Sequence, residues 1–211
     1  MVPLRTALHR ELALGAPGTD ATWQEALKPI RGADRRRELH LDKDQRVALL
    51  WSADDEILPS LRALCQLPLR PGAVANLKSS NFEGRARTLT IGKDKDGLSR
   101  QLSVPSTIAA FLAGSQIGKQ GDEPLFSRSD GQPWSKDRWK KPIKLAALEA
   151  NLPIETTAYV LRHSVITDLV RSGLPVLTVA QLSGTSVAMI ERHDGHLVRT
   201  DAEQSLAALQ I

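Results

Sequence analysis

Hydrophobic and polar positions follow a helical period along most of the chain and alternate in one short region. The helical period predicts helices over residues 4–14, 22–27, 41–55, 56–69, 106–114, 135–150, 158–173, 178–184, 186–193 and 199–209. Asp42 precedes the apolar positions of the third helix and is expected to be its N-cap. The alternating region covers residues 86–92 and 99–105, on either side of the turn KDKDG. This pattern predicts a β-hairpin, so the expected fold is mainly helical with a small antiparallel sheet.

The composition is that of an ordinary globular domain. The 211 residues suffice for one mid-sized domain, or for one domain and a fragment of another, and 41% of them are apolar. The single cysteine, Cys65, excludes an intramolecular disulfide framework or a CxxC-type zinc site, and its apolar surroundings predict a buried position. Neither a run of membrane-spanning length nor an opening signal peptide is present, which leads us to expect a cytoplasmic protein.

The basic residues are unevenly distributed. Lysine and arginine number 28 against 24 aspartates and glutamates, a net charge of +4 that permits a polyanionic partner without demanding one. The stretch KPIRGADRRREL lacks apolar periodicity and holds a dense group of cations: Lys28, Arg31, Arg35, Arg36 and Arg37. Such a cationic linker suits a DNA backbone, and a solvated charged connector explains it equally well.

Four separated segments carry residues that could form one site. Arg70 lies in a turn, LRPG, between two helical segments, and Lys95 lies in the predicted hairpin turn. Arg162 lies early on a predicted helix, with Tyr159 one turn before it and His163 beside it. The fourth segment is GTSVAMIERHDGHL, near the C-terminus. Each residue alone has an ordinary structural explanation, and only the ordered set points to a shared function.

This ordered set resembles the catalytic domain of the tyrosine recombinases, the phage-type integrases. The resemblance runs from Glu38 to the C-terminus, through an arginine in an LRPG turn, a hairpin lysine, a [His/Tyr]-x-x-Arg-His helix and a final GTSVAMIERHxGHL segment. It implies a mainly helical α+β catalytic domain over residues 38–211, with a three-stranded antiparallel sheet near residues 74–104. Residues 1–37 are then expected to hold a helix of the preceding DNA-clamping domain and the basic linker.

The resemblance also implies a chemistry. In that family a tyrosine attacks a DNA phosphodiester, forms a 3′-phosphotyrosine and releases a 5′-hydroxyl, without metal or cofactor. Arg70 and Arg162 would bind the phosphate, since arginine is always charged and donates in a bidentate fork. Lys95, which fits the spacing Lys-x-Gly-x-Ser-Arg, would protonate the leaving 5′-oxygen, with Lys93 as the alternative. Tyr159 stands at a usual histidine position, where a phenol can hydrogen-bond a phosphate oxygen.

Three positions depart from the family pattern. Thr185 stands where many relatives carry a histidine, and its hydroxyl is a weaker phosphate donor. Ala73 stands where relatives often have a supporting glutamate, so Arg70 is expected to be less firmly oriented. Asp194 occupies the position of the nucleophilic tyrosine, and the chain's only tyrosine has its own place in the site. We therefore expect a protein that does not cleave DNA as written, with Asp194 pairing to Arg70 or Arg162 when DNA is absent.

The remaining polar and aromatic candidates favour structural roles. The spacing of His193, Asp194 and His196 matches no standard zinc ligand set, so no metal site is expected. Trp134 and Trp139 are expected to pack around a helix start rather than to stack on bases.

The function favoured by this pattern is that of a site-specific recombinase or integrase, which binds double-stranded DNA and other protomers on it. The basic linker, Lys93 and His163 would add DNA contacts to those of the catalytic positions. Two alternatives remain: an architectural relative that binds recombination sites without cutting, and a helical protein-interaction domain. Salt-sensitive DNA affinity separates the first two from the third. The apolar stripe of residues 201–209 could dock onto a neighbouring protomer or pack on its own domain, and without DNA we expect a monomer.

Overall fold

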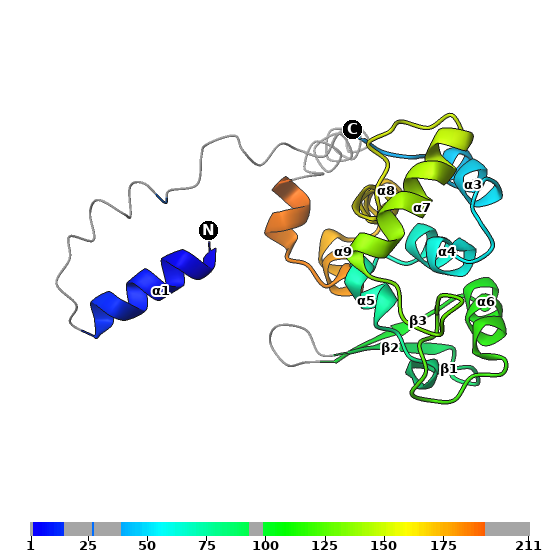
Figure 1. Ribbon diagram of the computed structural model, residues 1–211, viewed down its shortest axis with the longest axis horizontal. Helices are drawn as coiled ribbons and strands as arrows, with labels where there is room; N and C mark the ends of the chain where they lie inside the picture. Colours follow the sequence, from blue (N-terminus) through cyan, green and yellow to red (C-terminus); the bar gives the residue numbers. More distant parts are fainter. Residues whose placement is uncertain (1, 15–26, 28–38, 93–98, 193–211) are drawn as a thin grey trace, which may run out of the picture. The chain divides into compact units, whose positions relative to one another are not determined.

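The chain divides into two units, which we describe separately. In the computed structural model, the described residues are 2–14, 27, 39–92 and 99–192 (Figure 1). Unit 1 is Met1–Arg36 and unit 2 is Arg37–Ile211. Unit 1 contains α1 (Val2–Ala13), which confirms the first predicted helix. The basic linker and all of the second predicted helix except Leu27 lie outside the described residues.

Unit 2 opens with helices whose ends follow from capping and from proline. α3 (Lys43–Trp51) begins after Asp42, whose Oδ1 accepts the amide hydrogen of Gln45 at 2.8 Å. In return Gln45 Oε1 accepts the amide hydrogen of Asp42 at 3.0 Å, and this capping box confirms the predicted N-cap. α4 (Leu58–Gln66) ends two residues before a proline, and α5 (Pro71–Ala75) starts with one, where no amide donor is needed.

A three-stranded antiparallel sheet follows, in the order β1-β2-β3, as predicted. β2 (Thr88–Ile91) and β3 (Arg100–Ser103) pair from Thr88↔Ser103 to Ile91↔Arg100, which confirms the hairpin. The remaining strand, β1 (Phe82–Glu83), has only two residues and therefore leaves no alternating pattern in the sequence. The hairpin turn, residues 93–98, lies outside the described residues.

Four further helices follow the sheet: α6 (Ser106–Gln116), α7 (Lys136–Glu149), α8 (Ala158–Arg171) and α9 (Val176–Ser183). The backbone is helical again over residues 187–192, within a predicted helix. Figure 1 shows the sheet and α6 at one end of unit 2, and α3, α4, α7 and α8 at the other. None of the helices in the described ranges is long and apolar enough to cross a membrane.

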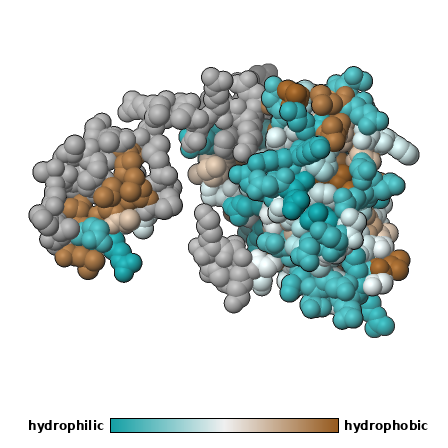
Figure 2. Space-filling model, in the orientation of Figure 1, coloured by the Kyte–Doolittle hydropathy of each residue, from teal (hydrophilic) through white to brown (hydrophobic). Residues whose placement is uncertain are grey.

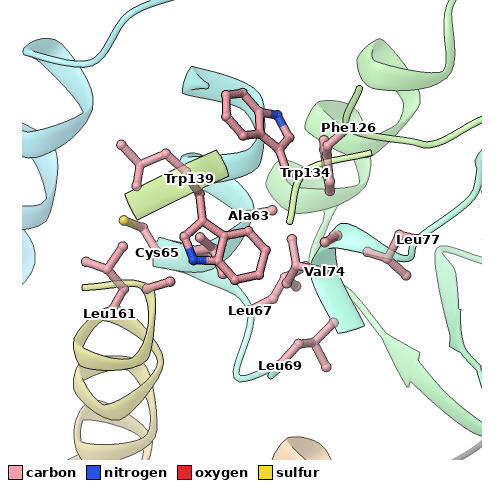
Figure 3. Close-up of a cluster of buried hydrophobic side chains, with 14 of the residues drawn as sticks. Ala63, Cys65, Leu67, Leu69, Val74, Leu77, Phe126, Trp134, Trp139 and Leu161 are labelled. Atoms are coloured by element: carbon pink, nitrogen blue, oxygen red, sulfur yellow. The ribbon is translucent and has the colours of Figure 1, made fainter. Parts of the chain in front are cut away.

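The main hydrophobic core joins these two ends. Figure 3 shows Trp139 among the side chains of Ala63, Cys65 and Leu67. Trp139 is 7% exposed and Trp134 is 4% exposed, which confirms their predicted packing role. Cys65 is also buried, as predicted, and its burial raises the pKa of the thiol to about 12. By contrast, the face of unit 2 seen in Figure 2 is mainly hydrophilic, with small separate apolar patches.

The first residues of unit 2 are anchored to α8. Asp168, on α8, accepts a hydrogen bond from the Arg46 guanidinium through Oδ2. Its Oδ1 lies 2.8 Å from Nε2 of His40. The amide of Leu41 donates to Ser164 Oγ, one helical turn earlier, at 2.9 Å. A smaller apolar cluster then packs α9 and the following helical segment onto α8, through Ile166, Val170, Val179, Ala180 and Ile190. These contacts fix the position of α8, which carries three of the predicted site residues: Tyr159, Arg162 and His163.

Candidate functional site

The start of α8 presents two of the predicted site residues on one face. The helix begins after Thr157, whose Oγ1 accepts the amide hydrogen of Val160 at 3.3 Å. Tyr159 and Arg162 are three positions apart and therefore project from the same side of the first turns. They differ in exposure: Tyr159 is 41% exposed and Arg162 only 8%. Tyr159 is thus accessible to solvent, whereas Arg162 beside it is largely enclosed by protein.

The guanidinium of Arg162 joins three segments of the chain. Its Nη1 donates hydrogen bonds to the carbonyl of Pro68 at 2.5 Å and to that of Ser183 at 3.1 Å. Pro68 lies two residues before Arg70, and Ser183 lies two residues before Thr185. Because a guanidinium is a rigid plane with five N–H donors, anchoring one nitrogen sets the direction of the others. Arg162 therefore ties the Arg70 turn and the end of α9 to α8.

Arg70 is held through its backbone instead. It is the N-cap residue of α5, with φ −62° and ψ 140°, and its carbonyl accepts the amide hydrogens of Ala73 at 2.8 Å and Val74 at 3.1 Å. The residue is exposed, and no hydrogen bond or ion pair joins its side chain to another residue within the described ranges. Ala73 is half-buried against the core and supplies no carboxylate to this turn. Among the described residues, none therefore fixes the direction of the Arg70 side chain.

Thr185 follows a left-handed helix end. α9 stops at Gly184, whose φ of 64° and ψ of 47° suit a residue without a Cβ. The amide of Thr185 donates to the carbonyl of Ala180 at 3.1 Å, so the turn that carries it is hydrogen-bonded back onto α9. Thr185 itself is half-buried. This turn places the threonine two residues from the carbonyl that Arg162 binds.

A cavity of about 350 Å³ lies beside Tyr159, between α7 and the start of α8. Three lysines of α7, spaced one turn apart, line it: Lys136, Lys140 and Lys144. Thr156 also lines it, and the buried Oγ1 of this residue has no hydrogen-bond partner within the described part of the chain. Lysine ammoniums are suitable donors to phosphate oxygens. These lysines were not among the site residues predicted from the sequence, although their spacing of one helical turn indicates a shared side of α7.

The structure leaves part of the predicted site undescribed. The predicted site residues outside the described ranges are Lys28, Arg31, Arg35, Arg36, Arg37, Lys93, Lys95 and Asp194. His163, expected to contact DNA, is half-buried next to Arg162 on α8. Within the described ranges, no group of three or more histidine, cysteine, aspartate or glutamate side chains is placed to hold a metal ion.

Comparisons with known proteins concern the family and the fold of the chain. The model of the phage integrase family matches residues 41–193. This chain is similar to the crystal structure of XerA recombinase, with 19% sequence identity and a TM-score of 0.65. The match covers 79% of this chain and 65% of the XerA chain, so this chain spans less than two thirds of that protein's length. The catalytic domain of bacteriophage HP1 integrase has 18% identity and a TM-score of 0.60, covering 80% of this chain and 93% of the domain.

A third similar structure is the Tn1549 transposon integrase in complex with a circular intermediate DNA. It has 14% identity and a TM-score of 0.70, covering 95% of this chain and 76% of that one. A search of curated protein sequences found no match. At these identities the structural likenesses establish the fold, which is that of integrase catalytic domains.

Proposed function

The chain belongs to the phage integrase family, and on that premise we propose that unit 2 is a tyrosine-recombinase catalytic domain that binds double-stranded DNA but lacks its nucleophile. In this proposal residues 38–211 form the catalytic domain. Residues 1–37 supply a helix of the DNA-clamping domain and the basic linker. The observation that carries the proposal is the buried side chain of Arg162. It donates to the carbonyl of Pro68, just before the Arg70 turn, and to that of Ser183, at the end of α9.

A DNA phosphate is the ligand that best fits this junction. Nη1 of Arg162 donates to the carbonyl of Pro68, and Arg70 stands exposed two residues beyond that carbonyl. Two guanidiniums can together donate to both non-bridging oxygens of a phosphodiester and stabilise the extra charge of the phosphorane transition state. The three cavity lysines extend the cationic surface along α7, where neighbouring phosphates of the same strand could bind.

The other predicted residues complete the proposed mechanism. Tyr159 and Thr185 hydrogen-bond the same phosphate through their hydroxyl groups. Lys95 protonates the leaving 5′-oxygen as general acid, and Lys93 is the alternative. Position 194 is where the nucleophile belongs, one residue after the helix predicted over residues 186–193.

Asp194 makes the protein deficient in cleavage. Attack by a carboxylate on a phosphodiester would give a labile acyl phosphate and would bring a negative charge towards an anionic group. The side chain is also shorter than that of tyrosine, so it does not reach as far. Without DNA, pairing of Asp194 with Arg70 or Arg162 neutralises the site. The same residue favours the second candidate function, an architectural protein that occupies recombination sites with other protomers and never cuts them.

Restoring the nucleophile tests the proposal. Asp194→Tyr is expected to form a covalent adduct with a nicked DNA substrate whose cleaved end diffuses away, whereas the protein as written forms none. Asp194→Phe is the matched control, because it adds the ring without the attacking oxygen. The adducts are counted by denaturing electrophoresis, and DNA affinity is measured at several salt concentrations.

The outcomes separate the candidate functions. An adduct with Asp194→Tyr alone supports a catalytic site that lacks one group. Salt-sensitive binding without any adduct would identify an architectural DNA-binding protein. Affinity that is absent or insensitive to salt would leave a protein-interaction domain, and an adduct with the unaltered protein would refute the role given to position 194.

A further inference from the structure

The C-terminus of α9 is capped by two arginines from distant parts of unit 2. A helix leaves its last four carbonyls without partners inside the helix. Nη1 of Arg100, on β3, donates to the carbonyl of Gln181 at 2.9 Å and to that of Leu182 at 3.0 Å. The next carbonyl, that of Ser183, accepts from Arg162 at 3.1 Å. One guanidinium proposed to bind phosphate and one from the sheet therefore share the last turn of this helix.

The remaining terminal carbonyl, that of Ala180, binds the turn that carries Thr185. The carbonyl of Ala180 accepts the amide hydrogens of Gly184 and Thr185. Each of the four terminal carbonyls thus has a partner, and only Arg100 satisfies two of them. Loss of Arg100 leaves two adjacent carbonyls of this turn exposed to competing donors such as water.

Gly184 provides the space in which the Arg100 guanidinium lies. A Cβ at position 184 would overlap Cζ of Arg100 and would lie 2.5 Å from its Nη2 and 2.6 Å from its Nη1. Atoms at such distances must move apart, and the flexible end of the arginine moves more easily than the helix. Any side chain at position 184 therefore displaces Arg100, apart from the strain that the left-handed backbone itself imposes.

We propose that Arg100 is a positioning residue, which fixes the end of α9 so that the Thr185 hydroxyl reaches the phosphate bound by Arg162. Gly184 is required because it leaves room for the Arg100 guanidinium. This inference rests on the proposed function. Arg100 itself does not contact the phosphate in this scheme. Its effect on cleavage therefore passes through Thr185, and its effect on DNA affinity is small.

A double-mutant cycle in the Asp194→Tyr protein tests the route of the effect. Arg100→Ala is expected to slow cleavage by roughly 10- to 100-fold, the usual consequence of losing a group that orients a functional residue. DNA affinity should change by less than about twofold, because Arg100 does not itself contact the phosphate in this scheme. In a Thr185→Ala background the same substitution should slow cleavage little further, since residues that act as a unit are not additive.

Three further variants separate orientation from general damage. Gly184→Asn accepts a left-handed backbone but carries a Cβ, so it should reproduce the cleavage defect of Arg100→Ala. Arg100→Lys keeps the charge and should restore part of the rate. Arg85→Ala removes an exposed arginine from the turn between β1 and β2 and should leave cleavage unchanged. Additive effects of Arg100→Ala and Thr185→Ala, or a loss of DNA affinity equal to the loss of rate, would overturn the inference.

Amide hydrogen exchange tests the inference independently of cleavage, in the full-length protein with Asp194 in place. The amide of Thr185 should exchange faster in Arg100→Ala and in Gly184→Asn than in the unaltered chain, while amides in α4 keep their rates. If Asp194→Tyr forms no adduct, the proposed function fails, and the exchange result still decides whether Arg100 fixes this turn. Unchanged exchange at Thr185 would contradict the positioning role.

Discussion

The regions around Arg70 and Arg162 hold their arginines by different means. Arg162 is 8% exposed and bonds the carbonyls of two other segments, so its guanidinium is part of the packing of the domain. Arg70 is exposed, and its turn is held by backbone hydrogen bonds to the start of α5. Arg162 is therefore both part of the packing and a proposed phosphate ligand, whereas Arg70 is proposed only as a ligand. The same substitution should have different consequences at the two positions.

Arg162→Ala is expected to have the largest effect. It leaves the carbonyls of Pro68 and Ser183 without their donor, which should destabilise the fold by about 1–3 kcal/mol. In the Asp194→Tyr protein it should also lower cleavage by roughly 10²- to 10³-fold, as for the loss of a transition-state donor. Urea denaturation and adduct formation measure the two effects separately. A variant of unaltered stability would show that the anchoring bonds contribute nothing.

Cys65 provides a second measure of this destabilisation. Its pKa of about 12 keeps the buried thiol protonated near pH 8, so a thiol reagent reacts only when the domain opens. The unfolded thiol has a lower pKa, so this group favours the folded state below pH 9 and ceases to do so as pH rises towards 12. Labelling at pH 8 should be faster in Arg162→Ala than in Arg70→Ala.

Arg70→Ala should affect function alone. Its stability is expected to stay within about 0.5 kcal/mol of the parent, because an exposed side chain without partners in the described chain is removed. Cleavage by the Asp194→Tyr protein should still fall by roughly 10²-fold. Thermal melting and adduct formation, measured side by side, check this separation. A large loss of stability would mean that the two arginines are alike after all.

Ala73→Glu should have the smallest effect and should make the Arg70 region more like the Arg162 region. Position 73 is the third residue of α5, where a glutamate can accept the N-cap amide hydrogen and can pair with the exposed guanidinium. Cleavage by the Asp194→Tyr protein should rise by about two- to fivefold, through better orientation of Arg70. Ala73→Gln is the neutral control. The gain must vanish in an Arg70→Ala background, and its persistence there would exclude orientation as the cause.

The sequence predicted those features that depend on neighbouring residues. The period of apolar positions and the Asp42 cap located helices, and alternation around an Asp-Gly turn located the hairpin. β1 escaped because two residues carry no period. The burial of Arg162 escaped for a different reason. Its carbonyl partners lie 94 and 21 positions away, and a backbone carbonyl has the same chemistry in every residue.

Arg100 and the α7 lysines show the same limit within the site. In the sequence, Arg100 stood out only as the final arginine of the spacing Lys-x-Gly-x-Ser-Arg. Its partners on α9 are 81 and 82 positions away. Nothing in the sequence indicates that the α7 lysines lie beside Tyr159, because that position depends on how α8 packs. The sequence therefore predicted the segments of the candidate site, whereas the contacts among the described segments became visible only in the fold.

The anchoring of Arg46 to Asp168 has a consequence for synthesis of the chain. The two residues are 122 positions apart, which a ribosome covers in about 6–24 s at roughly 5–20 residues per second. α3 and α4 are completed early in that interval, whereas α8, against which α4 packs, is synthesised at its end. The apolar side of α4 stays uncovered for most of those seconds, so the nascent chain needs protection from aggregation during that time. Translation that pauses before α8 should therefore lower the yield of folded protein more than a pause after it.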